Sequence, residues 1–382
     1  MKIALDARFF SRETAGLGRY THELIQNLAK IDKKNQYLVF IMKKDITDFK
    51  KLIKSPNFKV IGIDIEHYSL KEQSKFMSIL KKYDYDFIHF LNFNHPIMYS
   101  KPFLISIHDL TLYFFPSRSK TDFIHQMFFR KIMRHGVKKS KAIFSLTERT
   151  KKEVKSLFNI DSKKTTVTYC GISSNLKKCS EKNIEKFKKR NGLSAPYLLY
   201  VGQWRPHKNL VKLIEAFKIL KNRYKYNGKL VLTGVENPSW QDVSKTIKKL
   251  NLTKDIITPG FVNENELALW YSASEAFIFP SIQEGFGIPP LEAMACKIPV
   301  ISSDASCMPE VLGDAAHYFD PHNASDMAKQ IDKVLKNKKI QKKLIQKGLN
   351  QISYYSWEKM AKIILKKYNE IGEELKLMTK PE

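Results

Sequence analysis

Two glutamates that frame a glycine-rich turn are the residues of this chain best suited to chemistry. Glu284 and Glu292 stand eight residues apart, and Gly285, Phe286 and Gly287 lie between them. The apolar run before this turn is typical of a buried parallel strand, and the proline pair after it suits the first turn of a helix. Backbone N–H groups of such a turn can approach anionic oxygens, while carboxylates accept hydrogen bonds from hydroxyls. This combination favours a nucleotide sugar as ligand.

A second group of charged residues follows another predicted strand. Arg205 and Lys208 precede a helix predicted over 209–222. Cations at a helix start oppose the helix dipole, which favours anions there. A diphosphate bound between them would account for their position, and the alternative is a solvated surface pair. The neighbouring His207 is expected to be structural or to support the loop.

Two further candidate positions follow strands in the first half of the chain. Gly16 and Gly18 open a predicted helix, where they would let its N-terminus meet a phosphate or a sugar, although the pattern falls short of the dinucleotide motif. His108 ends the apolar run FLISIH, and the carboxyl end of a parallel strand is where ligands bind in α/β domains. The alternative is a buried histidine bonded to backbone, with Asp109 capping the next turn.

Two weaker patterns concern the base of a nucleotide and a metal ion. The segment 257–266 is predicted to be a strand, a turn and a helix start, and its turn around Val262 could hold a base through backbone groups. Asp84 and Asp86 resemble a metal-binding pair, but they precede a predicted strand and therefore lie at the opposite edge of the sheet from the candidate residues. We expect no bound metal and no cofactor.

The elements that position these residues alternate short apolar runs with longer helical segments, which is the pattern of parallel βα units. Apolar periodicity fades over a Lys-rich stretch at 173–195, and the pattern then restarts. The sequence thus predicts an α/β protein of two doubly wound Rossmann-like domains, 1–175 and 176–355, which face each other across a cleft. A long basic helix over 356–382 is predicted to cross back to the first domain.

Length and composition agree with a folded protein of two domains. The 382 residues exceed one ordinary core, and 43% of them are hydrophobic. No stretch approaches the roughly 18 apolar residues of a spanning helix, and the N-terminus lacks a signal peptide's apolar region. The four cysteines have no metal-ligand spacing and are expected to be reduced. We predict a cytoplasmic protein.

The net charge of +28 has two explanations. Lysines scattered over solvated helices would give it by compositional bias alone, whereas an anionic partner would give it a function. Nucleic acid is the least favoured partner, because no motif that reads it appears. The helix predicted over 121–139 sets apolar side chains beside Arg130, Lys131 and Arg134. It is a candidate for peripheral contact with an anionic membrane, and the alternative is that its apolar residues pack on the sheet.

Together these motifs resemble the retaining glycosyltransferases of family 4, which have the GT-B fold, and in particular the bacterial mannosyltransferases of surface-polysaccharide assembly. The resemblance covers nearly the whole chain. Glu284 and Glu292 match the family's E-x7-E signature, YVGQWRPHKNL its phosphate loop, AGLGRY its N-terminal glycine turn, and His108–Asp109 its H-D position. The terminal segment YSWEKMAKIILKKY resembles the family's helix that returns to the first domain.

The resemblance implies roles on the side of the leaving group. Arg205 and Lys208 would neutralise the donor diphosphate, and the turn of Gly285, Phe286 and Gly287 would add backbone N–H groups. Gly16 would approach from the other domain. Many relatives carry arginine immediately before the lysine, where this chain has histidine, so the role of the arginine is less firmly implied than that of the lysine.

The resemblance also implies roles around the sugar. Glu284 would hold hydroxyls of the donor sugar, Glu292 would accept from the ribose, and His108 would contact the sugar or the leaving phosphate. Stereochemistry would be retained without a metal. A transient nucleophile role for Glu284 is the alternative to sugar binding.

The predicted function is transfer of a hexose, mannose from GDP-mannose, to a glycan or lipid-linked acceptor in cell-surface glycan biosynthesis. One alternative is a UDP-sugar transferase or an epimerase of the same fold. Another is a non-catalytic basic adaptor for membranes or RNA on a degenerate transferase scaffold. Acceptor residues are expected in the loops around 66–76 and 92–120.

Overall fold

The computed structural model describes residues 1–11, 15–69, 71–115, 120–173, 175–236 and 241–378. The chain forms two compact units. Unit 1 comprises Met1–Gly171 together with Ser356–Glu382, and unit 2 comprises Ile172–Tyr355. The change of unit after residue 171 lies a few residues before the predicted boundary at 175.

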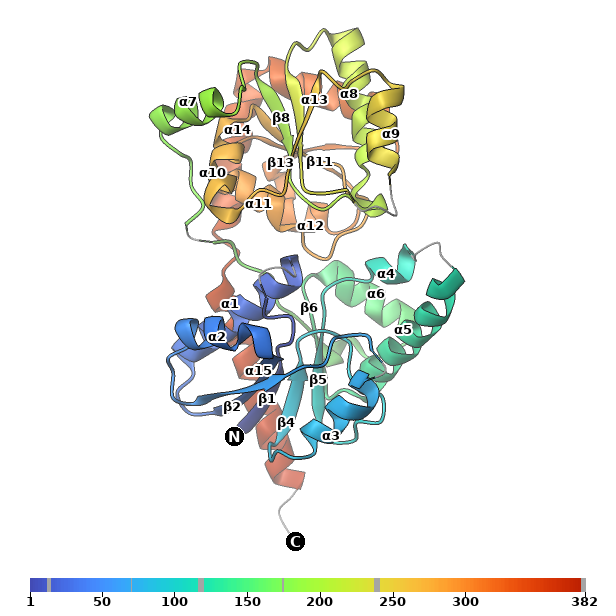
Figure 1. Ribbon diagram of the computed structural model, residues 1–382, viewed down its shortest axis with the longest axis vertical. Coiled ribbons are helices and arrows are strands. Elements are labelled where there is room, and N and C mark those ends of the chain that lie inside the picture. The colour runs from blue at the N-terminus through green and yellow to red at the C-terminus, as the bar shows by residue number, and fades with distance from the viewer. Residues whose placement is uncertain (12–14, 70, 116–119, 174, 237–240, 379–382) are drawn as a thin grey trace. The chain divides into compact units, whose positions relative to one another are not determined.

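Unit 1 is built on a seven-stranded parallel sheet with the order β3-β2-β1-β4-β5-β6-β7 (Figure 1). Its strands are β1 (Lys2–Asp6), β2 (Gln36–Met42), β3 (Phe58–Ile63), β4 (Phe87–Phe90), β5 (Phe103–Ile107), β6 (Ala142–Ser145) and β7 (Thr165–Val167). Every residue of β4, β5 and β6 is buried, because helices cover both faces of a parallel sheet.

Helices of unit 1 connect these strands and cover the sheet. They are α1 (Ala15–Ile31), α2 (Ile46–Leu52), α3 (Met77–Leu80), α4 (Thr111–Phe114), α5 (Lys120–Lys139), α6 (Glu148–Phe158) and α15 (Trp357–Met378). Short 3-10 turns occupy Lys43–Asp45 and Ser162–Lys164, and a π-helical turn, Glu72–Phe76, leads into α3. The helical segment that ends in α3 is therefore irregular.

Unit 2 repeats the arrangement with six parallel strands in the order β10-β9-β8-β11-β12-β13. Its strands are β8 (Tyr197–Tyr200), β9 (Lys229–Thr233), β10 (Ile256–Gly260), β11 (Ala276–Phe279), β12 (Val300–Ser303) and β13 (Ala316–Phe319). Its helices are α7 (Glu181–Arg190), α8 (Leu210–Tyr224), α9 (Asp242–Lys249), α10 (Glu264–Ala273), α11 (Ile288–Ala295), α12 (Met308–Leu312), α13 (Ala324–Lys336) and α14 (Lys338–Ile352), with 3-10 turns at Pro206–Lys208 and Gly313–Ala315.

Both sheets reverse their strand order at one point, between β1 and β4 in unit 1 and between β8 and β11 in unit 2. Loops that leave neighbouring strands in opposite directions open a crevice at such a switch point, which is where doubly wound domains bind ligands. The predicted pair of Rossmann-like α/β domains is confirmed. The cleft between them stays a prediction.

The first helix of unit 2 occupies the stretch in which a boundary was expected. α7 buries only Ile184 and Phe187, and the ring of Phe187 meets Trp270 edge to face at 4.9 Å. Most of its other residues are charged or polar. Two apolar residues in ten give little periodicity, which explains why the sequence pattern faded although a helix forms.

The last helix completes the core of unit 1. α15 lies against α1 (Figure 1). Its side chains Trp357, Met360, Ile364 and Tyr368 are buried. The Tyr368 hydroxyl lies 2.6 Å from Nδ1 of His89 in β4. A segment far away in sequence thus supplies part of the hydrophobic core, because the sheet would otherwise leave that face uncovered.

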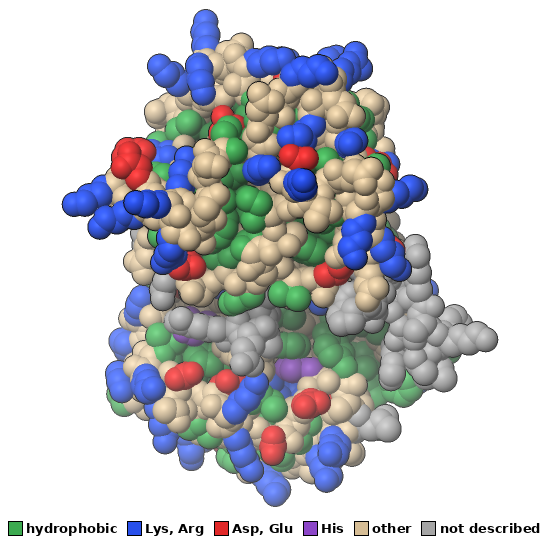
Figure 2. Space-filling model, turned by 45° about the horizontal axis from the view of Figure 1, so that its top comes forward, with side chains coloured by type: hydrophobic (Ala, Val, Ile, Leu, Met, Phe, Trp, Pro, Cys, Tyr) green, Lys and Arg blue, Asp and Glu red, His purple; other side chains and the backbone are tan. Residues whose placement is uncertain are grey.

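On the face that Figure 2 draws, the basic residues are scattered rather than gathered. Figure 2 shows Lys and Arg side chains spread over the visible face of both units, with few Asp and Glu among them. Such a distribution fits the compositional explanation of the +28 charge, because a charge that serves one partner concentrates on one face.

Candidate active site

The two charged loops predicted from sequence meet in unit 2. β8 and β11 are neighbours in the sheet, so the loops that follow them leave from the same edge. Lys208 ends the 3-10 turn after β8, and its Nζ lies 2.6 Å from Oε1 of Glu284 in the loop after β11. Their side chains are 19% and 11% exposed. A cation and a carboxylate thus stand side by side within reach of a ligand.

Asn209 locks these two loops together. Its backbone is left-handed, with φ of 60°. Its amide Nδ2 donates to the carbonyls of Pro280 at 3.1 Å and Pro321 at 2.8 Å. The N–H of Ile282 donates to the carbonyl of His207 at 2.8 Å, which gives His207 the structural place expected for it. The position of Lys208 relative to Glu284 is therefore fixed by backbone contacts on both sides.

The loop after β12 holds the backbone of Glu284. The Glu284 N–H donates to Oγ of Ser306, and the Glu284 carbonyl accepts from the same hydroxyl, both at 3.1 Å. Cys307 Sγ also donates to this carbonyl at 3.3 Å. These bonds leave the carboxylate as the only part of Glu284 that can turn toward a ligand.

The glycine turn has the geometry expected for it. Gly285, Phe286 and Gly287 are buried, and Gly287 has φ of 81° directly before α11. The left-handed backbone requires glycine here, and a Cβ at Gly287 would also lie 2.5 Å from Cε of Met308, so the end of that side chain would have to move. Prolines occupy the first turn of α11, where a missing N–H costs least.

Glu292 lies deeper than its predicted role suggests. It is 2% exposed, and its Oε2 accepts from the hydroxyl of Tyr271 at 2.9 Å. The structure thus places it on the buried face of α11, eight residues after Glu284. Contact with a ribose stays a prediction.

The remaining unit 2 candidates lie on the same edge of the sheet. Arg205 is exposed, and among the described residues its guanidinium has no partner. Val262 is half-buried just after β10, and the adjacent Phe261 is 82% exposed. Asn263 caps α10, with its side chain accepting from the Glu266 N–H at 3.0 Å. An exposed aromatic ring at this edge is a surface on which a nucleobase could stack.

His108 of unit 1 lies where β5 ends. Its Nε2 is 2.7 Å from the carbonyl of Leu91, and its ring meets Tyr20 edge to face at 4.5 Å. Burial lowers the pKa of His108. Because a carbonyl can only accept, Nε2 carries the proton, and the neutral ring presents Nδ1 as an acceptor. Asp109 caps the following turn by accepting from the Thr111 N–H at 2.7 Å.

These bonds give His108 the structural role that was its alternative. They also leave Nδ1 able to accept a hydrogen bond from a hydroxyl.

Gly16 and Gly18 lie in α1. Gly16 is exposed and has nothing within 4 Å of where a Cβ would stand, whereas Gly18 is buried. Open space at Gly16 fits the expected approach of a ligand.

A buried charged cluster at the end of β1 was missed from the sequence. Arg8 Nε and NH2 each lie 2.8 Å from an Asp6 oxygen, and Arg8 also bonds Glu72. Asp6, His67 and Glu72 could offer metal-ligand atoms within 4.8 Å of one another. Arg8 already pairs with both carboxylates and stands where a metal ion would compete with it, so the set does not suit a metal ion. The spacing Asp6-x-Arg8 after the first strand was the available signal.

The Asp84 and Asp86 pair lies at the opposite edge of the sheet, as predicted. Asp84 pairs with Nζ of Lys2 at 2.9 Å, and Asp86 accepts from the Lys2 N–H at 2.9 Å, at the start of β1. These carboxylates hold the N-terminal end of the strand and have no place among the candidate residues.

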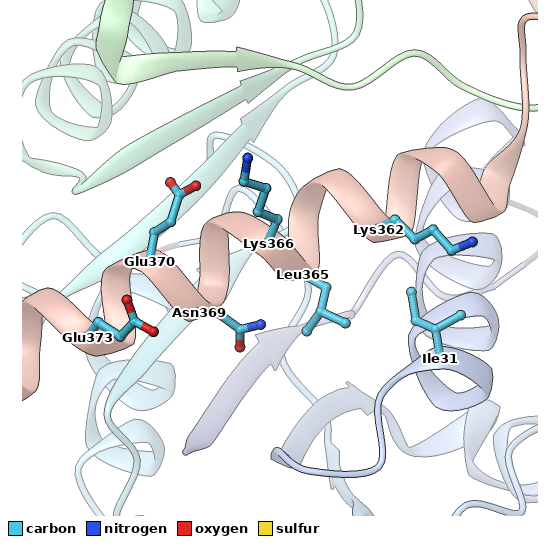
Figure 3. A pocket seen from close by; sticks show the side chains of 7 residues that line it. All are labelled: Ile31, Lys362, Leu365, Lys366, Asn369, Glu370 and Glu373. Atoms are coloured by element: carbon cyan, nitrogen blue, oxygen red, sulfur yellow. The ribbon is translucent and has the colours of Figure 1, made fainter.

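One hollow among the described residues is unrelated to these sites. It measures about 500 Å³ and lies along α15 beside Ile31 (Figure 3). Ile31 ends α1 and therefore lies near the starts of the strands. Figure 3 shows Lys362, Lys366, Glu370 and Glu373 around it. None of the predicted site residues lines it.

Comparison with known proteins assigns the family. Residues 14–176 match Glycosyltransferase Family 4, and residues 181–351 match Glycosyl transferases group 1. The chain belongs to the family 4 glycosyltransferases. The resemblance noted from the motifs is thereby confirmed, and this glycosyltransferase has the GT-B fold.

Individual relatives cover most of this glycosyltransferase. The chain is 25% identical to O-antigen chain mannosyltransferase B of Escherichia coli over 94% of its own length and 97% of the relative's. It is 29% identical to O-antigen chain mannosyltransferase RfbU of Salmonella typhimurium, over 71% of its own length and 70% of the relative's. Sucrose-phosphate synthase from Thermosynechococcus elongatus superposes with a TM-score of 0.77 at 20% identity, covering 98% of this chain and 100% of that one.

The helices of this glycosyltransferase are too short or too polar to span a membrane, as far as the structure describes them.

Proposed function

We propose that this glycosyltransferase transfers mannose from GDP-mannose to a glycan or lipid-linked acceptor in the assembly of a cell-surface polysaccharide. The assignment of the active site rests on the Lys208–Glu284 pair, in the loops that follow β8 and β11. The likeness to O-antigen mannosyltransferases, over 97% of the length of one relative and 70% of the other, supports the sugar and the pathway class.

Breaking the sugar–phosphate bond leaves positive charge on the sugar and negative charge on the diphosphate. Lys208, Arg205 and the N-terminal turn of α11 would stabilise the charge on the diphosphate, since fixed donors need no rearrangement during the reaction. Glu284 would then exchange its contact with Lys208 for sugar hydroxyls. His108 would accept a hydrogen bond from another hydroxyl through Nδ1, which suits a sugar better than a phosphate because a phosphate offers no proton.

The nucleotide is tested by thermal shift. GDP should raise the melting temperature more than UDP at equal concentration, and the Phe261→Ala variant should reduce the shift if the base stacks on this ring. Tyr354→Ala is the matched control, because it removes another exposed aromatic ring, one that is 68% exposed. A larger shift with UDP would make the protein a UDP-sugar transferase. No shift with either nucleotide would favour the non-catalytic adaptor.

We also propose that unit 1 contacts an anionic membrane surface through α4 and α5. Leu112, Phe114, Met127 and Phe128 are 43–59% exposed. Ile132 and Met133 of α5 pack in the core, which agrees for these two residues with the alternative given for this helix.

Cations accompany these exposed apolar residues. Arg130, Lys131 and Arg134 are exposed on α5, and the Arg130 guanidinium lies 4.7 Å from the ring centre of Tyr113 in α4. Apolar side chains that enter the headgroup region beside cations that stay at its surface are typical of interfacial helices.

Replacing Arg130, Lys131 and Arg134 with glutamate should reduce the fraction of protein that sediments with phosphatidylglycerol vesicles. The same reversal at Lys339, Lys342 and Lys343, which are exposed on α14 of unit 2, controls for net charge. Equal losses from the two triple variants would mean that the membrane senses only overall charge. No loss from the α5 variant would exclude this helix.

A further inference from the structure

The hydrophobic core of unit 1 contains a line of polar side chains that the proposed reaction does not use. The Tyr368 hydroxyl in α15 lies 2.6 Å from Nδ1 of His89, and Nε2 of His89 lies 2.9 Å from Oγ of Ser106 in β5. The Tyr20 hydroxyl in α1 lies 3.0 Å from the same oxygen. Each of these four residues is at most 1% exposed. We call them the buried chain, and it joins two helices to two neighbouring strands.

Hydrogen bonds can satisfy every contact of the buried chain at once. Burial and the nearby charge of His108 lower the pKa of His89 to about 3, so its ring is neutral. A neutral imidazole donates from one nitrogen and accepts at the other, and each hydroxyl can do both. Fully paired polar groups in a core hold their side chains rigid. The Tyr20 ring is therefore fixed at its hydroxyl by Ser106 as well as at its base by α1.

The same tyrosine ring forms one wall of the His108 side chain. The two ring centres are 4.5 Å apart, and the ring planes meet at 86°. Side chains two positions apart in a strand face the same side of the sheet. Ser106 in β5 and His108, which directly follows the strand, are two positions apart. This spacing explains how Tyr20 reaches Ser106 with its hydroxyl and His108 with its ring.

Two contacts together settle the orientation of the imidazole. The carbonyl of Leu91 holds Nε2 of His108 at 2.7 Å, and the Tyr20 ring limits rotation of the imidazole about that point. Nδ1, the nitrogen left to accept a hydrogen bond, then points in one direction. An acceptor assists a reaction most when it is already aimed at its partner, because a small displacement of a reacting group costs rate.

We propose that Tyr20 is a positioning residue for His108. Its hydroxyl is anchored in the buried chain, and its ring holds the imidazole so that Nδ1 faces a hydroxyl of the donor sugar. Through His89 and Ser106, the closing helix α15 contributes to this order as well. The effect on transfer rests on the proposed function, in which His108 contacts the sugar, whereas the placement of the imidazole does not.

Nitrogen NMR of protein labelled with isotopic histidine tests the placement without any substrate, and a His108→Gln variant identifies the signals. The wild type should show His108 protonated on Nε2 alone. Tyr20→Leu removes the wall, so these signals should move toward the average of the two tautomers, and Tyr20→Phe should restore them. Tyr37→Leu is the control, because it removes another buried tyrosine of unit 1, stacked on Phe58 at 4.3 Å at the start of β2. It should leave the His108 signals unchanged.

Steady-state kinetics with GDP-mannose test the consequence for transfer. Tyr20→Leu should lower kcat by about tenfold, as expected for a misaligned group, with little change in the KM for the donor. Tyr20→Phe should recover most of kcat, and Tyr37→Leu should keep it. The GDP-induced thermal shift should be the same in all of these variants. If circular dichroism shows that Tyr20→Leu does not fold, Tyr20→Met removes the ring while filling more of its space.

The inference is overturned if the ring-less Tyr20 variant leaves the His108 signals as in the wild type. It is also overturned if Tyr37→Leu changes them equally, since this would indicate a general loosening of unit 1. A wild-type kcat in a variant with altered signals would mean that the orientation of His108 does not matter to transfer. Altered signals in a protein that consumes no nucleotide sugar would refute the proposed function and leave the placement of His108 by Tyr20 standing.

Discussion

At the scale of single residues, the Lys208–Glu284 pair gives the sharpest expectation. Replacing Lys208 by alanine removes the cation aimed at the diphosphate, and kcat/KM should fall by about 10²–10³, as when one fixed transition-state donor is lost. Lys212→Ala is the control, because Lys212 pairs with Glu215 at 2.7 Å on the exposed face of α8. Steady-state kinetics that show equal rates for the two variants would refute the role of Lys208.

Glu284→Gln tests the same pair from its other side. The amide keeps one acceptor for sugar hydroxyls and removes the charge, so transfer should fall while the GDP-induced thermal shift stays within a degree or so. If GDP binding fell as strongly as transfer, Glu284 would belong to the nucleotide and not to the sugar. Circular dichroism and the urea midpoint would show that the fold is intact.

The sequence predicted where Lys208 and Glu284 lie in the sheet, because their positions follow directly from strand geometry. Lys208 and Glu284 each follow a short buried strand, and parallel strands bring such positions to one edge. The sequence could not show that Glu292 is buried and hydrogen-bonded to Tyr271, since this depends on packing between α10 and α11. Nor could it show Arg8 with Asp6 and Glu72, because Glu72 lies 64 residues away along the chain.

At the scale of the elements, the turn before α11 makes a clear prediction. Gly287→Ala should reduce the free energy of unfolding by more than ~1 kcal/mol, since alanine would both enter a left-handed conformation and collide with Met308. Gly192→Ala is the control, because Gly192 has φ of 63° and open space around it, so only the conformational cost of about 1 kcal/mol applies. Urea unfolding measures both, and equal losses would show that the contact with Met308 does not matter.

Elements were less predictable where few apolar residues define them. α7 buries two side chains, and the segment before α3 adopts a π-helical turn around Glu72. Tertiary contacts with Trp270 and Arg8, rather than a periodic apolar pattern, decide both elements.

At the scale of the whole molecule, acid should weaken unit 1 well before carboxylates titrate. Burial lowers the pKa of His89 to about 3 and that of His95 to about 4, and it also lowers the pKa of His108. In the unfolded chain these histidines bind protons near pH 6.5, so stability is full above that value and is lost as the pH falls toward the folded values.

The loss should amount to a few kcal/mol between pH 7.5 and 5. Urea midpoints at these two values measure it, and a His95→Gln variant, which cannot take up a proton, should lose less than the wild type. A midpoint that does not change between the two pH values would mean that the buried histidines are hydrated or already charged in the native state.

The central claim is that the Lys208–Glu284 edge of unit 2 transfers a sugar from a nucleotide donor. The most direct measurement incubates the purified protein with a panel of radiolabelled nucleotide sugars and a mannoside acceptor, and follows the label. We expect GDP-mannose to be consumed with retention of configuration by the wild type and by Lys212→Ala, and not by Lys208→Ala. Neither transfer nor hydrolysis of any donor in the panel would contradict the account.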